Sequence, residues 1–260
     1  MPMSLFRNVL HLSMLAGMGF LAAGPAHSGL IHQYTFNGNV NDQVGGGVNG
    51  TLVGDASAAG GVLTLDGSGD WVSFGSNFLV PTSGSYSVLL FAKFTYDGNV
   101  HEFISQGNSG GPGFYIGPYG NEMRVSDNYG WTATPSFSGS CGGVCTGIEA
   151  PSDGDWHHYA LVVSSGSAEF FIDGISRGTR SGFSIGGASP TVLGSQFGGN
   201  WELFNGMMQD VRIYDNALST SAVQEIIANQ SGVPEPGSAV LVGSVMLVAG
   251  LLKRRQRGSV

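Results

Sequence analysis

The sequence predicts an all-β fold, an antiparallel sandwich of two sheets that is followed by one short helix. Short segments with a period-two alternation of apolar side chains recur through residues 29–231, separated by turns rich in Gly and Ser. Helical periodicity first appears near residue 219. The 44 glycines suit a fold with many tight turns. About 200 residues are enough for both sheets to bury one face in a shared core.

The alternating segments place the strands in order along the chain. The first begins at Ile31, the next at Trp71 and a longer one at Tyr86. Residues 157–163 and 168–174 flank a Ser-Ser-Gly-Ser turn, which predicts a hairpin.

The last strand and the helix follow. In the strand expected at 207–215, Val211 and Ile213 share one face. Ser219 is the expected N-cap of the helix, and Gly232 follows its end. The apolar face of the helix holds Val223, Ile226 and Ile227.

Residues 106–155 are unusually rich in Gly, Ser and Pro. Such a composition favours turns over regular structure. We therefore expect long loops here, at one end of the sandwich.

The two ends of the chain look like targeting segments. Arg7, the apolar run 9–23 and the small residues after it predict a signal peptide over residues 1–28. Near the C-terminus, the apolar run 238–252 is at or under the roughly 17 residues that a spanning helix needs. The basic residues of 253–257 follow it and would stay cytoplasmic. Physics alone predicts a weak transmembrane anchor.

The domain between these ends is strongly acidic. Residues 29–232 hold 17 acidic and 5 basic residues, which gives a net charge of −12. Such a surface repels phosphate backbones, so we expect no nucleic-acid partner. Acidic exported domains do suit Ca²⁺, which prefers hard oxygen ligands.

The chain has two cysteines, Cys141 and Cys145, in the sequence CGGVC. In an oxidising compartment they are expected to form a disulfide bond. The spacing excludes a C-x-x-C redox motif, and two cysteines alone make a poor zinc site.

Three blocks resemble the laminin G-like (concanavalin A-like) jelly roll. They are the opening segment from His32 with LTLDGSGDWVSFG, the pair DWHHYALVV and AEFFIDG, and the closing FNGMMQDVRIYDNALS with its helix. The resemblance implies a two-sheet antiparallel jelly-roll sandwich over residues 29–231. The terminal apolar runs add an N-terminal signal helix and a C-terminal hydrophobic helix to this expectation.

Residues 232–260 resemble the PEP-CTERM sorting signal. The motif is Val233 with Pro234, Glu235 and Pro236, followed by the apolar helix and the basic tail. The resemblance implies a Gram-negative bacterium, transient anchoring in the inner membrane, and processing by an exosortase. It also implies release to the cell surface or to an extracellular polysaccharide matrix.

The sequence lacks the acid pattern of the glucanases that share this fold. Those glucanases carry paired acids as Glu-x-Asp-x-Glu along one strand. The i, i+2 spacing brings two carboxyl groups as close together as a retaining mechanism requires. Here Asp153 and Asp155 have that spacing but precede a strand, and Glu122 and Asp127 are five residues apart. We therefore do not expect an enzyme.

Calcium is the expected cofactor, because many laminin G-like domains bind one Ca²⁺ at the rim of the sandwich. Asp42 is the best candidate ligand, with Asp66 and Asp210 near strand ends as further candidates. Asp70, also near a strand end, is another candidate. The alternative is ordinary, since Asp in Gly-rich turns often bonds its own backbone.

Glycan binding would use exposed aromatic rings. The candidates are Tyr115, Tyr119, Tyr129 and Trp131 in the loop-rich stretch and Trp201 in GGNWELF. The alternative is that these rings cover the core or close a loop.

Together these features predict an exported, non-enzymatic recognition or structural module at the cell surface. Its expected partner is extracellular polysaccharide or a surface protein. Two alternatives stay open, a glycoside hydrolase or lyase acting on exopolysaccharide and a purely structural matrix protein.

Overall fold

The computed structural model describes most of the predicted domain. The described residues are 29–45, 47–108, 111–126, 145–185, 189–199 and 201–231. The signal peptide, the sorting signal with Pro234, Glu235 and Pro236, and the candidate ligands Tyr129 and Trp131 lie outside them. So does Cys141, and its disulfide with Cys145 stays a prediction.

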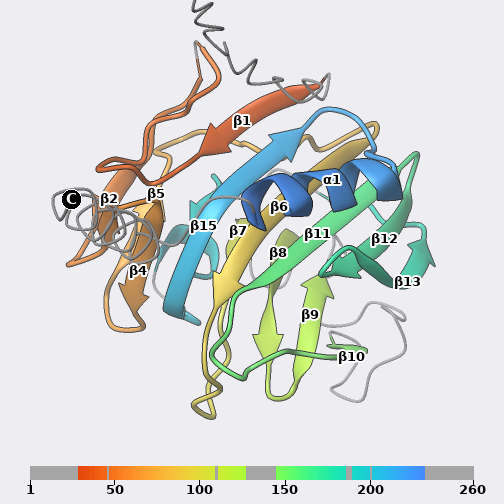
Figure 1. Ribbon diagram of the computed structural model, residues 1–260. Helices are drawn as coiled ribbons and strands as arrows, with labels where there is room; N and C mark the ends of the chain where they lie inside the picture. The colour runs from red at the N-terminus through yellow and green to blue at the C-terminus, as the bar shows by residue number, and fades with distance from the viewer. Residues whose placement is uncertain are drawn as a thin grey trace, which may run out of the picture.

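The domain is a sandwich of two antiparallel sheets (Figure 1). The larger sheet has the strand order β13-β12-β11-β6-β15-β4-β3, and β1 pairs with β15 outside this path. Its eight strands are β1 (Leu30–Tyr34), β3 (Ser57–Ala59), β4 (Val62–Asp66), β6 (Tyr86–Lys93), β11 (His157–Ser164), β12 (Ser167–Ile172), β13 (Ile175–Ser181) and β15 (Asn205–Tyr214).

The second sheet has the order β10-β9-β8-β7-β14-β5-β2. Its seven strands are β2 (Thr51–Val53), β5 (Trp71–Ser73), β7 (Ile104–Asn108), β8 (Gly111–Tyr119), β9 (Glu122–Ser126), β10 (Cys145–Glu149) and β14 (Val192–Leu193). The predicted two-sheet antiparallel sandwich is confirmed.

The predicted hairpin is confirmed as β11 and β12. The two strands pair from Tyr159 with Ile172 to Ser164 with Ser167. Ser165 and Gly166 between them both have positive φ, 49° and 82°. Positive φ at both central residues matches the right-handed twist of the strands, and the second of these residues is glycine, the residue that adopts it most easily.

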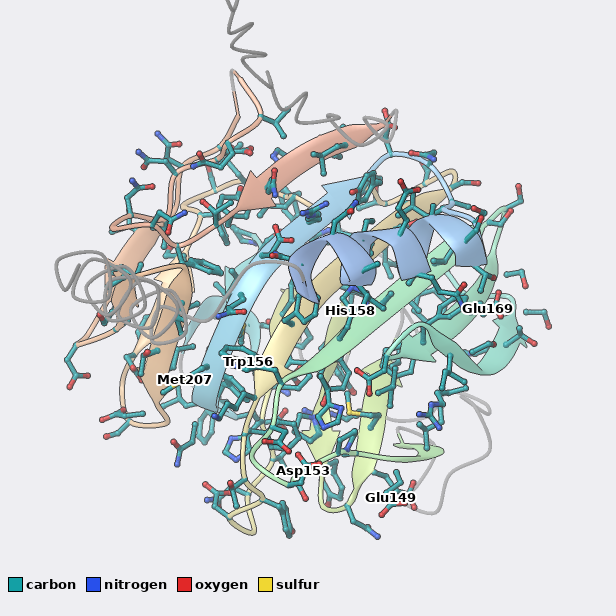
Figure 2. All side chains as sticks on the ribbon, viewed as in Figure 1. Glu149, Asp153, Trp156, His158, Glu169 and Met207 are labelled. Carbon is teal, nitrogen blue, oxygen red and sulfur yellow. The ribbon has the colours of Figure 1, made fainter. Side chains whose placement is uncertain are left out.

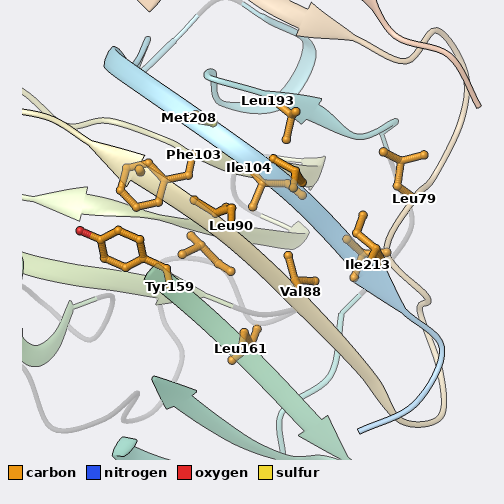
Figure 3. Packing of buried hydrophobic residues seen from close by; sticks show 14 of the residues in the cluster. Leu79, Val88, Leu90, Phe103, Ile104, Tyr159, Leu161, Leu193, Met208 and Ile213 are labelled. Carbon is orange, nitrogen blue, oxygen red and sulfur yellow. The ribbon is translucent and has the colours of Figure 1, made fainter. Parts of the chain in front are cut away.

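The core lies between the two sheets and follows the alternation read from the sequence (Figure 3). Val88 and Leu90 on β6, with Tyr159 and Leu161 on β11, all face it. Phe103, which precedes β7, packs edge-on or tilted against other core rings. Each fully buried large apolar side chain stabilises the fold by roughly 1.5–3 kcal/mol.

Helix α1 (Thr220–Ser231) covers the outer face of the larger sheet (Figure 1). The hydroxyl of Ser219 accepts a hydrogen bond from the N–H of Ala222 at 3.2 Å, which confirms the predicted N-cap. Val223 and Ile226 pack with sheet residues that include Phe171 and Tyr214. The helix therefore forms a small second core behind the sheet.

The expectation of long loops through residues 106–155 is wrong for much of that stretch. Strands β8, β9 and β10 and most of β7 lie within it. Phe114 and Ile116, like Met123 and Val125, are buried at period-two spacing. This alternation outweighs the Gly-rich composition, because neighbouring strands form hydrogen bonds with the backbone N–H and C=O groups and the core buries the apolar side chains.

Candidate functional site

An open groove lies at the end of the sandwich where β4 and β6 end and β15 begins, the lower end in Figure 1. Its volume is about 540 Å³. Three segments line it, the turn after β4, the loop between β6 and β7, and the segment before β15. The lining residues are Asp66, Gly67, Asp97, Asn99, Val100, His101, Trp201, Glu202, Leu203 and Asn205.

Strand pairing brings these three segments together. Asn205 pairs with Asp66, and Met207 pairs with Lys93, so the start of β15 lies between the ends of β4 and β6. Because all three strands are antiparallel neighbours in one sheet, their connecting loops must meet at the same rim.

Trp201 is the most exposed large apolar side chain among the described residues, with 69% of its surface accessible. Its backbone is held in place, because its carbonyl oxygen accepts a hydrogen bond from the N–H of Gln196 at 2.7 Å. The short 3-10 helix η2 (Phe197–Gly199) lies between these two residues. A fixed backbone that presents an exposed indole is suited to contact a ligand. Of the five predicted aromatic ligands, Tyr129 and Trp131 lie outside the described residues. Tyr115 is buried and Tyr119 is 38% exposed, and neither lines the groove, whereas Trp201 does.

A buried ion cluster lies beside the groove. The guanidinium of Arg124 on β9 donates to the carboxylates of Glu102 and Glu202. Arg124 and Glu102 are both fully buried, and the ring of Tyr115 lies 4.4 Å below the guanidinium carbon. The N–H of Glu102 also donates to the carbonyl oxygen of Glu202 at 3.0 Å. These contacts tie the segment carrying Trp201 to the second sheet.

The cluster shifts the pKa of each member. Burial raises the pKa of Glu102 despite the opposing charge of Arg124. Burial also acts on Glu202, but its hydrogen bond with Arg124 outweighs it and the pKa of Glu202 is lowered. The arginine stays charged, because the two carboxylates raise its pKa against the effect of burial. Glu202, which reaches the groove, is therefore a carboxylate at neutral pH.

Asp97 and His101 also line the groove. His101 is buried, and its two ring nitrogens contact the Leu203 carbonyl oxygen at 2.6 Å and an Asp97 carboxylate oxygen at 2.9 Å. Although burial opposes it, hydrogen bonds from the Asn99 N–H and from His101 hold the pKa of Asp97 at about 2. The groove thus has a second carboxylate that stays ionised.

The carboxylate of Asp42, the best sequence candidate for a metal ligand, already has hydrogen-bond partners within the chain. Its carboxylate accepts from the N–H groups of Gln33, Val44 and Val48 at 2.9–3.2 Å and contacts a ring nitrogen of His32 at 2.6 Å. These contacts match the alternative reading of an Asp that organises its own loop.

Asp210 is also supplied with donors. The side chains of Gln33 and Gln230 donate to it at 2.7 and 2.6 Å, and Arg212 forms an ion pair with it at 2.7 Å. Asp210 sits at the bulge of β15 with a φ of 46°. Because Gln230 belongs to α1, these contacts fasten the helix to the sheet.

Asp66 is separated from the other two candidates. It pairs with Asn205, five residues along β15 from Asp210, which corresponds to roughly 17 Å of strand. Its neighbours are instead Asp55 and Asp70, and one carboxylate oxygen of each lies within 4.8 Å of the others. Asp42, Asp66 and Asp210 therefore do not form one set, whereas the candidates Asp66 and Asp70 do lie together.

Of the acids weighed as catalytic candidates, Asp127 lies outside the described residues, and Asp153 and Asp155 lie close to His157. Asp153 and Asp173 contact the two ring nitrogens of His157 at 3.2 and 2.8 Å, and Asp155 donates its N–H to Asp153 at 2.9 Å. Of the adjacent histidines, His158 is buried against the ring of Phe91. Figure 2 shows Asp153 at the lower end of the molecule and His158 farther up, near α1.

The sequence reading missed Glu102, Arg124 and Glu202. A signal was present, since each is a charged residue among apolar neighbours at alternating positions, as in HEFI, EMRV and WELF. Charges inside such strands are rarely buried without a partner. Which charges pair could not be read, because the three residues lie as far as 100 positions apart.

Comparison with known proteins identifies the family. The model of the Concanavalin A-like lectin/glucanases superfamily matches residues 66–224, and the chain belongs to this superfamily. The laminin G-like resemblance drawn from the sequence is thereby confirmed.

The chain is similar to one curated protein, adhesion G-protein coupled receptor V1 of Danio rerio. The two are 30% identical over 164 residues, which cover 60% of this chain and 2% of the receptor. The match therefore concerns a small part of that protein.

Solved structures share the fold. Domain 4 of AbnA, a GH43 extracellular arabinanase from Geobacillus stearothermophilus solved with arabinotriose, has a TM-score of 0.60 at 21% identity. The alignment covers 76% of this chain and 98% of that domain. The binding domain of botulinum neurotoxin serotype D has a TM-score of 0.55 at 13% identity, covering 78% of this chain and 52% of that one.

Among the described residues, no helix has both the length and the apolarity needed to cross a membrane. The predicted transmembrane run, 238–252, lies outside those residues.

Proposed function

We propose that this chain is a carbohydrate-binding module that holds glycan in the groove beside Trp201. The observation that carries the proposal is an indole, 69% exposed, on a fixed backbone at the wall of a polar groove. A flat apolar ring that faces solvent can stack on the C–H face of a sugar ring.

The groove also offers the polar groups that sugar hydroxyls need. Asp97 presents a carboxylate whose side chain is 31% exposed, and Asn99 and Asn205 line the same space. An apolar platform with a few fixed polar side chains is the usual composition of a small-ligand site.

The electrostatics of the groove favour binding over hydrolysis. A glycosidase needs one carboxylic acid that keeps its proton near neutral pH. The pKa values of Asp97 and Glu202 are both shifted downward, so both are carboxylates. Glu102 and Asp70, whose pKa values are raised, are both buried, so neither carboxyl group is open to a substrate in the groove.

The same charges narrow the class of glycan. With Asp66, Asp97 and Glu202 around it, the groove would repel a polyuronate. A neutral polysaccharide is therefore the proposed ligand. An arabinanase domain of this fold solved with arabinotriose supports the choice, though only through the fold.

The setting is proposed from the sequence. The chain would be exported, processed at the PEP-CTERM signal by an exosortase, and retained in extracellular polysaccharide. The terminal segments that carry this proposal lie outside the described residues.

The test is binding of the purified chain to soluble neutral polysaccharides, including arabinan, and to alginate as a polyuronate. We expect binding to at least one neutral glycan and a loss of about tenfold or more in Trp201→Ala. Phe78→Ala is the matched control, because Phe78 is an exposed ring, 44% accessible, that does not line the groove.

Two results would contradict the proposal. Equal binding by Trp201→Ala and the wild type would place the glycan elsewhere. Release of new reducing ends from the glycan during incubation would instead favour the hydrolase alternative.

A further inference from the structure

Glu202, the residue after Trp201, has a backbone conformation that residues other than glycine rarely adopt. Its φ is 51°, in the left-handed region. This conformation costs free energy for an L-residue with a side chain, because the Cβ atom lies too close to the following carbonyl oxygen. It persists only where the surrounding contacts hold it, and such residues concentrate at binding sites. The contacts that hold Glu202 therefore also decide where Trp201 lies.

Two main-chain contacts hold this segment. The carbonyl oxygen of Glu202 accepts a hydrogen bond from the N–H of Glu102 at 3.0 Å, and that of Leu203 contacts a ring nitrogen of His101 at 2.6 Å. Both involve the backbone of residues 202 and 203, so neither requires a carboxylate at position 202. The side chain of Glu202 must have a further role.

That side chain makes the contact that depends on its identity. It is only 19% exposed, and its carboxylate accepts a hydrogen bond from Nη2 of the buried Arg124. The adjacent Trp201 is 69% exposed. Two neighbouring side chains thus have opposite surroundings, since one is held by a buried cation and the other faces solvent.

The ion cluster is poorly satisfied for one that serves stability alone. Arg124 donates to both carboxylates through Nη2, whereas its buried Nε and Nη1 have no hydrogen-bond partner within the described part of the chain. The same is true of Oε2 of Glu102. A buried ion pair with unpaired polar atoms adds little net stability, and apolar residues of similar volume often serve as well. These features favour a role in fixing geometry.

An exposed indole needs such a fixed geometry. Burial of its apolar surface against the protein would be favourable, so a loosened segment would let the ring of Trp201 fold back. A ring that is already held in its binding position loses less affinity to ordering when a ligand arrives.

We propose that Glu202 and Arg124 are positioning residues, whose ion pair holds the indole of Trp201 exposed at the wall of the groove. The position of the indole stands on these contacts alone, whereas its effect on glycan rests on the proposed function. Glu202 also lines the groove, so a direct hydrogen bond from its carboxylate to a sugar hydroxyl is the competing explanation. The two explanations differ in whether Glu202 still matters once the indole is removed.

The position of the ring can be tested without a ligand by ¹⁹F NMR of the chain labelled with 5-fluorotryptophan. The chain has four tryptophans, and the resonance of Trp201 is the one that Trp201→Phe lacks. Glu202→Gln should move this resonance and reduce its shift between H₂O and D₂O, because the ring becomes less exposed. Glu169→Gln is the matched control, since it makes the same chemical change on β12, away from the groove, and should leave the resonance in place.

A second variant separates positioning from direct contact. Arg124→Met/Glu102→Gln changes two fully buried residues, which cannot touch a glycan. It should move the Trp201 resonance as Glu202→Gln does. A role in stability alone would change the free energy of unfolding and leave the resonance of the folded protein where it is.

The effect on binding is tested by a double-mutant cycle with arabinan as the probe. Glu202→Gln should weaken binding about fivefold or more in the wild-type background, and less than about twofold in the Trp201→Ala background. Arg124→Met/Glu102→Gln should weaken it to a similar extent in the wild-type background.

The outcomes separate this inference from the proposed function. An unchanged Trp201 resonance in both Glu202→Gln and Arg124→Met/Glu102→Gln overturns the positioning role. An equal loss of affinity from Glu202→Gln in both backgrounds also overturns it, in favour of direct contact. If the resonance moves but the wild type binds no neutral glycan, the ion pair does position the indole and the proposed function fails.

Discussion

Two acidic clusters lie near the same end of the sandwich, and only one of them has a cationic side chain among the described residues. Glu102 and Glu202 share the guanidinium of Arg124, so the chain itself supplies the counter-charge. Asp55, Asp66 and Asp70 have no cationic side chain among the described residues. In the first cluster Arg124 and Glu102 are fully buried, whereas two members of the second face solvent. The difference teaches that the fold supplies a cation where carboxylates are enclosed, whereas solvent and salt screen the charges of exposed carboxylates.

The largest effect is expected from removing the internal cation. Arg124→Met leaves the buried Glu102 without a partner, which should lower the free energy of unfolding by roughly 3–5 kcal/mol. Urea denaturation followed by tryptophan fluorescence measures it. The double variant Arg124→Met/Glu102→Gln should recover part of the loss, because it removes the uncompensated charge. An Arg124→Met variant as stable as the wild type would show that the pair is dispensable.

A smaller effect is expected where hydrogen bonds rather than a cation satisfy the acid. Asp42→Ala leaves three backbone N–H groups without an acceptor, and we expect a loss of roughly 2–3 kcal/mol. Asp55→Ala, measured in EDTA, should stay within about 0.5 kcal/mol of the wild type. Equal losses of stability in the two variants would contradict the view that the hydrogen bonds of Asp42 make it the more important carboxylate.

The cluster of Asp55, Asp66 and Asp70 should affect how the stability of the metal-free protein depends on pH. Because the pKa of Asp70 is raised, the folded state binds this proton more tightly than the unfolded state does. Its contribution is therefore complete below about pH 4 and is lost as pH rises through the folded pKa. Asp70→Asn should flatten this part of the profile of Tm against pH in EDTA. A wild-type profile identical to that of the variant would contradict the raised pKa of Asp70.

The smallest effect is expected at an exposed cluster. Burial opposes charge on His157, but the hydrogen bonds that its ring donates to Asp173 and Asp153 outweigh this effect and raise its pKa. The stability it contributes is complete below pH 6.5 and is lost as pH rises through the raised pKa. His157→Gln should lower Tm by about 1–2 °C at pH 5.5 and by less at pH 8.5. The opposite order would mean that the neutral ring is the stabilising form.

The sequence by itself determined the fold class and the main strands. Alternation at Tyr86 and through 157–174, and the cap at Ser219, depend on neighbours in sequence, so their structures could be predicted locally. It failed in 106–155 because a Gly-rich composition hid an alternation that only strand pairing makes decisive.

Only the tertiary structure decided which polar residues meet. Asp42, Asp66 and Asp210 look alike in sequence. Asp42 and Asp210 accept hydrogen bonds from neighbouring groups, whereas Asp66 lies with Asp55 and Asp70. Trp201 was a candidate from the start, but its position beside Asp97 follows from the pairing of β15 with β4 and β6. The physical reason is that the role of a charged or aromatic side chain depends on its partners, which come from strands distant in sequence. The order of strands in a sheet cannot be predicted from the spacing of residues along the chain.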